Sequence, residues 1–272
     1  MTYQQLIHQY QNAIEHRVNL YWDAEKDRVI ADQETCIGAL VLDRKRMKQP
    51  DTNDVAKVLL DVIRSKEMRP LPWTPEAQAV IDRAAFVVRH CFGSEENVTS
   101  QKGEVLSVQR FRNLSRDWLM ERMEEWLLPH LLGLISLAQL EKLNLEQIFE
   151  NLLDWPEQQY LNEIAPARLK MPTGSQIRLD YSDVDNPVLA VRLQELFGQA
   201  DIPKLVDGKV RISIHLLSPA YRPAQITTDL AGFWANSYDA VKKDLKGQYP
   251  KHYWPDDPMQ AEPTTRAKPR KK

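Results

Sequence analysis

The chain has 272 residues, of which 27% are charged, and its formal net charge is -2. This length is enough for two or three small domains, and the near-neutral charge argues against one uniformly basic nucleic-acid cradle while leaving room for a local basic patch. Two cysteines, Cys36 and Cys91, are too few for a disulfide framework or a zinc cluster. No apolar run reaches the roughly 18 residues of a membrane span and no signal-peptide pattern opens the chain, so we expect a cytoplasmic protein without a membrane partner.

The first 50 residues predict a short helix and a β-hairpin. Scattered apolar positions over residues 1–16 indicate a weakly amphipathic helix. Apolar and polar side chains alternate over residues 18–22, and residues 23–27 favour a turn. Residues 29–42 then predict a long second strand that bends near Gly38, since a glycine inside a strand pattern often marks a bend.

Residues 51–165 predict a helical layer of four or five members. The first helix follows a cap at Asp51, and the second opens with Pro75 and ends near Gly93. A polar loop covers residues 94–103, and a third helix is expected to end at Pro129. The tryptophans of this layer lie on apolar stripes, which favours core packing over base stacking.

Two capping-box patterns follow in the same layer. Ser136 is followed three residues later by Gln139, and Asn144 by Gln147. The apolar positions after the second pattern predict a helix that ends at residues 154–156.

Residues 166–258 predict a small α/β domain. Residues 177–181 alternate like a strand, and Asn186 opens a helix that runs to Gly198. Asp207 and Gly208 form a strong turn signal before a strand that starts at Val210. From residue 228 apolar residues recur at helical spacing up to a C′ glycine at Gly247, and residues 236–237 allow this stretch to be two short helices.

The end of this domain combines positive charge with aromatic rings. Two prolines flank Arg222 and set the direction of its side chain, and three lysines follow on the polar side of the predicted helix. Charge and aromatic faces together are typical of single-stranded nucleic-acid binding. The candidate nucleic-acid-binding residues are Arg222, Lys242, Lys243, Lys246, Lys251, His252 and Trp254. The alternative is that the aromatic residues dock the segment onto the domain and the cations are merely exposed.

The sequence contains no catalytic motif that we can assign. A nucleotide-binding loop requires G-x-x-x-x-G-K-[ST], but Gly208-Lys209 precedes Val210 and has no glycine five residues upstream. No Asp-Glu-Ala-His is present, and the six histidines have no metal-binding spacing. We therefore expect no catalytic residue, no metal site and no cofactor in this chain.

The run over residues 216–258 resembles the C-terminal domain of the HrpB-type ATP-dependent RNA helicases of the DEAH/RHA class. The resemblance rests on Ser218-Pro219, Arg222-Pro223, Gln225-Ile226-Thr227, Asp229-Leu230, Phe233-Trp234, Tyr249-Pro250-Lys251-His252 and Trp254-Pro255-Asp256-Asp257-Pro258. It extends to residues 172–175 and 188–198, and residues 22–23 and 37–42 are similar to the end of the family's OB-fold region.

The resemblance implies an α+β protein with a partial OB-like β-hairpin region at 1–50, a helical domain at 51–165, a C-terminal α/β domain at 166–258 and a basic disordered tail at 259–272. An OB barrel needs five strands. We therefore expect the chain to begin inside a domain whose earlier strands lie elsewhere.

The resemblance also implies a function. The chain is expected to be an accessory part of a helicase that binds RNA or another single-stranded nucleic acid, or that docks a partner. The motor domains, present in cis or in trans, would bind ATP and Mg²⁺. The alternative is a non-enzymatic protein-interaction module that binds no nucleic acid.

Overall fold

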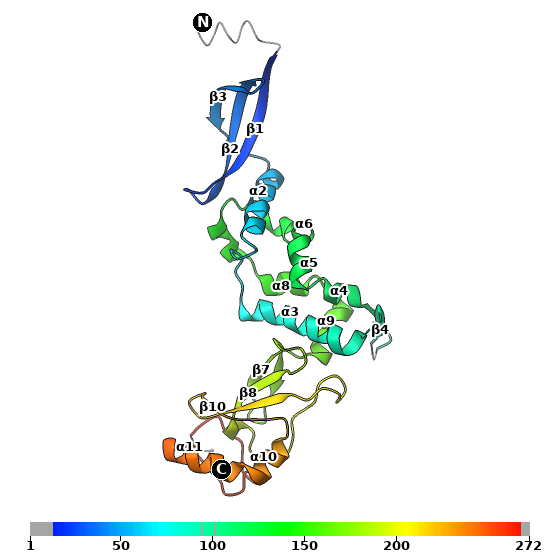
Figure 1. Ribbon diagram of the computed structural model, residues 1–272, viewed down its shortest axis with the longest axis vertical. Coiled ribbons are helices and arrows are strands. Elements are labelled where there is room, and N and C mark those ends of the chain that lie inside the picture. Colours follow the sequence, from blue (N-terminus) through cyan, green and yellow to red (C-terminus); the bar gives the residue numbers. More distant parts are fainter. Residues whose placement is uncertain (1–12, 94, 101, 268–272) are drawn as a thin grey trace. The chain divides into compact units, whose positions relative to one another are not determined.

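The computed structural model describes residues 13–93, 95–100 and 102–267. The chain divides into two compact units, each made of two segments (Figure 1). The first unit comprises Met1–Thr74 and Arg116–Ile148, and the second comprises Pro75–Ser115 and Phe149–Lys272. The stretch predicted as one helical layer, residues 51–165, thus contributes to both units, which are described separately below. The helices and several sheets make the fold α+β, as predicted.

The first unit opens with a three-stranded antiparallel sheet in the order β1-β2-β3. Its strands are β1 (Ile14–Asp23), β2 (Arg28–Ile37) and β3 (Leu40–Arg46). The backbone N–H groups of Glu25 and Lys26 donate to Asp23 Oδ1, which closes the first turn. The prediction of one long strand bent at Gly38 is wrong, because Gly38 has a φ of 56° and forms the turn between two strands. Most of the predicted N-terminal helix lies outside the described residues.

Helix α2 (Thr52–Ser65) confirms the predicted cap, since the Asp51 side chain accepts from the N–H groups of Asn53 and Asp54. The predicted third helix is three short ones, α5 (Arg116–Glu121), α6 (Met123–Trp126) and α7 (Leu128–Leu131). Pro129 does not end a helix but occupies the first turn of α7, where its missing N–H has no partner to lose. The capping box of Ser136 and Gln139 is confirmed at the 3-10 helix η3 (Leu137–Lys142).

The second unit begins with α3 (Pro75–Val87), which continues as a π-helical turn, η2 (Val88–Phe92), up to Gly93. The predicted polar loop at 94–103 contains a short strand, β4 (Asn97–Thr99), which pairs antiparallel with β5 (Val105–Ser107) just after it. Three more helices are α4 (Val108–Arg112), α8 (Leu145–Glu150), whose residues up to Ile148 are assigned to the first unit, and α9 (Trp155–Ile164). Helix α9 was not predicted, and the buried Arg83 ties α3 to it by donating to the Ala165 carbonyl at 2.5 Å.

A five-stranded sheet forms the rest of the second unit, in the order β10-β9-β8-β7-β6. Only the β8·β9 pair is parallel. The strands are β6 (Arg168–Lys170), β7 (Gln176–Asp180), β8 (Val188–Arg192), β9 (Ser213–Leu217) and β10 (Pro223–Thr227).

The helix predicted after Asn186 is wrong. Residues 188–192 form β8, and a single 3-10 turn, η4 (Leu193–Glu195), follows. Leu189 pairs with Ile214 and Val191 with Leu216, and all four side chains are buried. A short apolar run is compatible with a helix or a buried strand, and here the two neighbouring strands decide.

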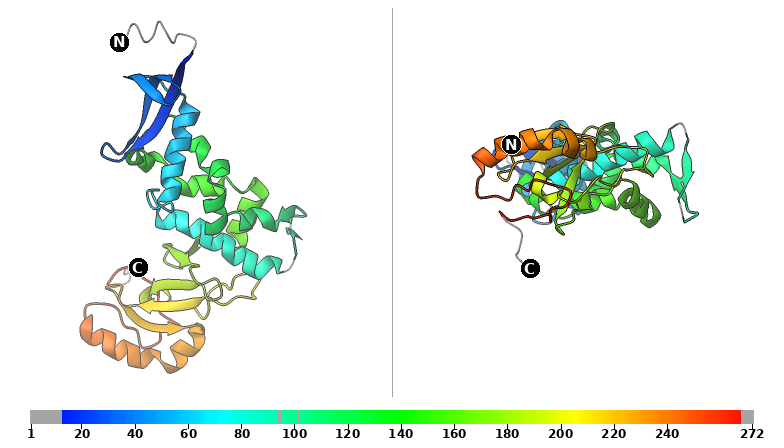
Figure 2. Two further views of the ribbon diagram at one scale, coloured as in Figure 1. Left: turned by 45° about the horizontal axis from the view of Figure 1, so that its top comes forward. Right: turned by 90° about the horizontal axis from the view of Figure 1, so that it is seen from below.

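Helices α10 (Leu230–Asn236) and α11 (Tyr238–Gln248) pack along one face of this sheet (Figure 1 and Figure 2). The break at Ser237 confirms the alternative of two short helices. Gly247 lies inside α11 rather than beyond its end, so the predicted C′ position is wrong. The buried face carries an aromatic cluster of Phe197, Phe233, Trp234 and Tyr238, with Tyr253 from the following segment.

Candidate nucleic-acid interface

Arg222 lies on the tight corner between β9 and β10, with its side chain exposed. Ser218 holds this corner, because its N–H donates to the Arg222 carbonyl at 2.8 Å and its Oγ accepts from the Arg222 N–H at 3.1 Å. Tyr221 adopts a φ of 60°, and the Arg192 guanidinium lies 5.1 Å from the centre of its ring. The proline-flanked corner is therefore rigid, and it presents Arg222 at one end of the sheet.

A groove of about 400 Å³ lies beside Arg222, between the corner and α11. Its α11 side consists of Ala240, Val241, Asp244, Leu245 and Gln248. Gln248 Nε2 donates to Asp244 Oδ2 at 3.2 Å, which orients that carboxylate. The charged lining is thus one arginine and one aspartate, so the groove is not a basic channel.

The predicted lysines lie away from this groove. At 3.6 residues per turn, the groove-lining residues occupy one side of α11, while Lys242 and Lys246 occupy another. Lys242 is only 13% exposed, and its Nζ lies 2.6 Å from Asp256 Oδ1 and 5.7 Å from the centre of the Tyr238 ring. The hydrogen bond and charge of Lys242, with a smaller effect of Lys246, lower the pKa of Asp256. Lys243 and Lys246 are exposed.

The segment after α11 is fastened to the domain by two of the predicted site residues. Trp254 is 8% exposed, and its Nε1 donates to the Tyr249 carbonyl at 2.9 Å. The His252 Nδ1 lies 3.2 Å from Gln194 Oε1, within hydrogen-bond distance. Both side chains therefore make contacts inside the domain, whereas Lys251, which directly precedes His252, is exposed.

The charges around α11 are balanced. Four lysines, Lys242, Lys243, Lys246 and Lys251, share this region with four aspartates, Asp239, Asp244, Asp256 and Asp257. All four aspartates are exposed. The local basic patch expected here is therefore a mixed surface on which three of the lysines are exposed.

Part of the stretch predicted as a disordered tail is hydrogen-bonded to the domain. The Thr264 N–H donates to the Gln194 carbonyl at 2.9 Å, and the Tyr253 N–H donates to the Ala267 carbonyl at 2.7 Å. Gln194 thus meets both the tail and His252. The terminal cations from Lys268 onward lie outside the described residues.

Residues 172–175, which contribute to the family resemblance, contact a buried carboxylate. Glu195 is 2% exposed and accepts from Arg192 Nε at 3.0 Å, from Thr173 Oγ1 at 2.9 Å and from the Ser175 hydroxyl. These bonds tie the turn around Gly174, where φ is 87°, to η4. The residues of this run therefore have a structural role in the domain.

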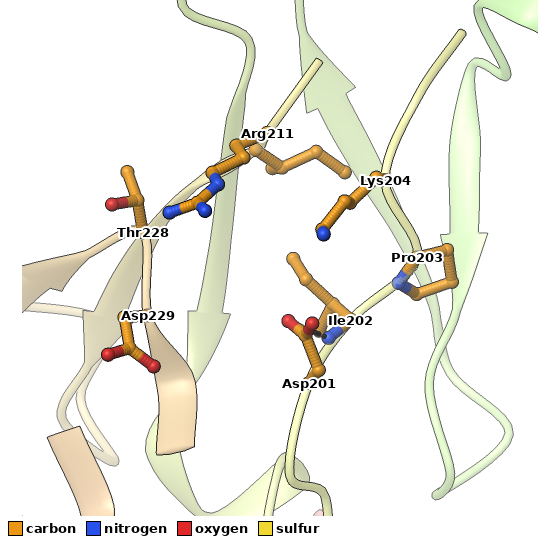
Figure 3. A pocket seen from close by; sticks show the side chains of 8 residues that line it. Asp201, Ile202, Pro203, Lys204, Arg211, Thr228 and Asp229 are labelled. Carbon is orange, nitrogen blue, oxygen red and sulfur yellow. Dashed lines mark hydrogen bonds between the residues drawn. The ribbon is translucent and has the colours of Figure 1, made fainter. Parts of the chain in front are cut away.

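Two polar features were not found from the sequence. One is a cavity of about 280 Å³, with lining residues that include Asp201, Lys204, Arg211, Thr228 and Asp229 (Figure 3). The Asp207-Gly208 turn was the sequence signal near it, but a turn signal does not indicate a cavity.

The other feature is the polar face of the sheet β1-β2-β3, where Asp32 and Glu34 are 4% and 2% exposed. Glu34 accepts from Arg17, Asn19 and Arg44, and Asp32 accepts from Tyr21 and pairs with Arg46. Burial acts to raise the pKa of Glu34, but these hydrogen bonds outweigh it and lower the pKa.

Among the residues that the structure describes, no group of three or more His, Cys, Asp or Glu side chains is arranged to hold a metal ion. No helix within the same residues is long and apolar enough to cross a membrane.

Comparisons with known proteins identify two regions of the chain. A family model described as ATP-dependent helicase C-terminal matches residues 126–258, and one described as the connector region of the ATP-dependent RNA helicase HrpB matches residues 14–47. The ATP-dependent RNA helicase HrpB of Escherichia coli (strain K12) is 37% identical over 247 residues, which is 91% of this chain and 29% of the relative.

Two solved structures are similar to this chain. The crystal structure of E. coli DExH-box NTPase HrpB matches with a TM-score of 0.67 and 34% identity, over 98% of this chain and 31% of that one. The crystal structure of Escherichia coli DEAH/RHA helicase HrpB matches with a TM-score of 0.59 and 33% identity, over 89% and 29%. The chain therefore spans less than a third of the length of these relatives.

Proposed function

This chain belongs to the HrpB family of ATP-dependent helicases, matching the C-terminal region of its relatives, and from that premise we propose that it supplies an accessory RNA-contacting surface to a helicase motor. ATP and Mg²⁺ would be bound by the motor domains. The contribution of this chain would be to hold or guide the single strand.

The observation that carries the proposal is the set of exposed lysines on α11 and just after it. Lys243, Lys246 and Lys251 are exposed, and no ion pair involves them within the described part of the chain. Lys246 lies in the last turn of α11, where the helix dipole also favours cations. An ammonium group is a point charge that suits a phosphate, so these contacts would be independent of base sequence.

The other predicted site residues take different roles in this proposal. Lys242 is paired with Asp256, and His252 and Trp254 hold the segment that carries Lys251. Arg222 lies at the end of the sheet beside Asp244 rather than among the lysines. With aspartates interleaved among the lysines, we expect weak binding.

The test is the salt dependence of binding to a fluorescent single-stranded RNA oligonucleotide. Three lysines neutralise at most three phosphates, which gives a log–log slope of roughly -2 at about -0.7 per phosphate. Changing Lys243, Lys246 and Lys251 to Ala together should flatten that slope. Lys242→Ala is the matched control, because its charge is already paired, and it should change the slope much less.

Two outcomes would contradict the proposal. A triple variant with an unchanged slope would show that α11 is not the contact surface. A chain that binds no RNA at low salt would favour protein docking instead.

Protein docking is the second candidate, and one observation favours it. Tyr221 and Ile226 are 65% and 57% exposed on or beside β10, which is the edge strand of the five-stranded sheet. Exposed apolar side chains on an edge strand suit a protein partner, and the motor domains of the family are the expected one. Ile226→Ser, which removes the apolar side chain without adding a charge, should weaken association with a separately produced HrpB-type motor and leave RNA binding unchanged.

A further inference from the structure

The turn over residues 205–210 brings two cations together. The N–H of Leu205 donates to the Val210 carbonyl at 2.9 Å, and the N–H of Val210 donates to the Leu205 carbonyl at 3.1 Å. Lys204 and Arg211 are therefore the next residues on the two paired segments, where side chains of an antiparallel pair lie near each other. Figure 3 shows both side chains directed into the same cavity.

This arrangement is unfavourable by itself. Like charges at adjacent cross-strand positions repel each other. The turn is also strained, because Val206 and Asp207 have φ values of 52° and 51°, a region that a β-branched residue such as valine rarely adopts. No ion pair joins Lys204 or Arg211 to another residue in the part of the chain that the structure describes. A bound anion would offset the repulsion that the turn creates.

The other residues that line the cavity restrict the class of ligand that it can bind. Thr228 and Asp201 also line the cavity, and Figure 3 shows the Asp201 carboxylate on the side opposite the two cations, with the Thr228 hydroxyl directed away from them. Asp201 Oδ1 accepts from the Ile202 N–H at 2.9 Å, which leaves Oδ2 for a ligand. Asp229 is oriented as the cap of α10, because its Oδ1 accepts from the Gly232 N–H, and it adds a second carboxylate to the lining. A bare phosphate would face the Asp201 carboxylate, whereas a phosphate next to a hydroxyl donor would satisfy both kinds of group.

We propose that this cavity binds one nucleotide of single-stranded RNA, with the phosphate between Lys204 Nζ and the Arg211 guanidinium and the ribose 2′-hydroxyl donating to Asp201. The inference rests on the proposed RNA contact and adds a specific subsite to it. Arginine and lysine donors suit a phosphodiester. A contact to the 2′-hydroxyl distinguishes RNA from DNA. A cavity of about 280 Å³ suits one nucleotide rather than a larger ligand.

The test compares RNA and DNA oligonucleotides of one sequence, using the full chain. Changing Lys204 and Arg211 to Ala together should lower affinity for both about tenfold and reduce the salt slope by about 0.7, as expected for one lost phosphate contact. Asp201→Ala should lower RNA affinity while DNA affinity stays the same or rises, since a nearby negative charge is removed. Lys209→Ala is the control, an exposed lysine in the same turn that does not line the cavity.

Each outcome has a distinct meaning. If the unmodified chain binds no RNA, the proposed function and this inference both fail. If it binds RNA but the cavity variants behave like Lys209→Ala, only the subsite is overturned. An unchanged RNA-to-DNA ratio in Asp201→Ala also overturns it. If uridine 5′-monophosphate binds the cavity while the variants leave RNA affinity unchanged, the cavity is a free-nucleotide site. Thermal melting checks that every variant is folded.

Discussion

At the scale of single residues, the environment of Trp254 favours a packing role for its ring over a base-stacking role. A ring that stacks on a base must be open on one face, whereas this indole is 8% exposed and donates its N–H inside the domain. Trp126, at 2% exposure, is a core residue as predicted, while Trp155 is 69% exposed and does not fit that prediction. The spacing of tryptophans along the chain could not distinguish these environments.

Trp254→Ala should destabilise the second unit without acting on RNA directly. Removing a buried tryptophan typically costs about 3–5 kcal/mol of unfolding free energy, so the melting temperature should fall. Trp155→Ala, at an exposed position of the same unit, should change stability by no more than about 0.5 kcal/mol. A variant with an unchanged melting temperature but a weaker RNA affinity would instead assign Trp254 to base stacking.

At the scale of elements, the sheet β1-β2-β3 shows how paired strands accommodate buried charge. The strand register places Glu34 of β2 opposite Arg17 of β1 and opposite Arg44 of β3. The distance from Glu34 Oε2 to Arg17 Nε is 3.2 Å, and the distance from Glu34 Oε1 to Arg44 Nη2 is 2.8 Å. Asp32 of β2 likewise lies opposite Arg46 of β3 and forms an ion pair with it. The two carboxylates are nearly covered, while the three arginines remain about half exposed. Removing one partner would leave a charge without its hydrogen bonds.

The lowered pKa of Glu34 predicts a dependence of stability on pH. The folded state favours the ionised form, so Glu34 contributes stability above the ordinary pKa of 4.5, and this contribution is lost as pH falls through the lower folded value. Unfolding in urea should show that Glu34→Gln is less stable than the unmodified chain at pH 7.

The control for this experiment is Glu15→Gln, at an exposed position of β1. The difference between the unmodified chain and Glu34→Gln should shrink as the pH is lowered below 4.5. A difference that is constant with pH would contradict the role assigned to the ionised carboxylate.

At the scale of the whole molecule, the sequence lacks two motifs that an ATP-dependent helicase motor uses. Neither a nucleotide-binding loop nor an Asp-Glu-Ala-His motif is present, so the purified chain should release no phosphate from ATP, with or without RNA. Mixing in HrpB-type motor domains is the positive control for the assay. ATP turnover by the chain alone that survives repurification would contradict this prediction.

The sequence by itself determined the features whose partners lie within a few residues. The Asp51 cap, the Ser136 capping box and the break at Ser237 were predicted because each involves near neighbours in the chain. The resemblance to the family was also readable from the sequence, because it rests on rare residues at fixed spacing over residues 216–258, a stretch inside the region that the family model matches.

Only the tertiary structure decided the features that depend on distant segments. Residues 188–192 form a strand because β7 and β9 flank them, although their apolar pattern also fits a helix. Lys242 forms an ion pair with Asp256 and is therefore not part of the exposed lysine surface. The cavity beside Lys204 forms where loops from different parts of the chain meet at one end of the sheet. Burial, ion pairs and cavities of this kind form between segments that are far apart in the sequence. Local periodicity reflects only neighbouring residues, so it cannot predict these contacts.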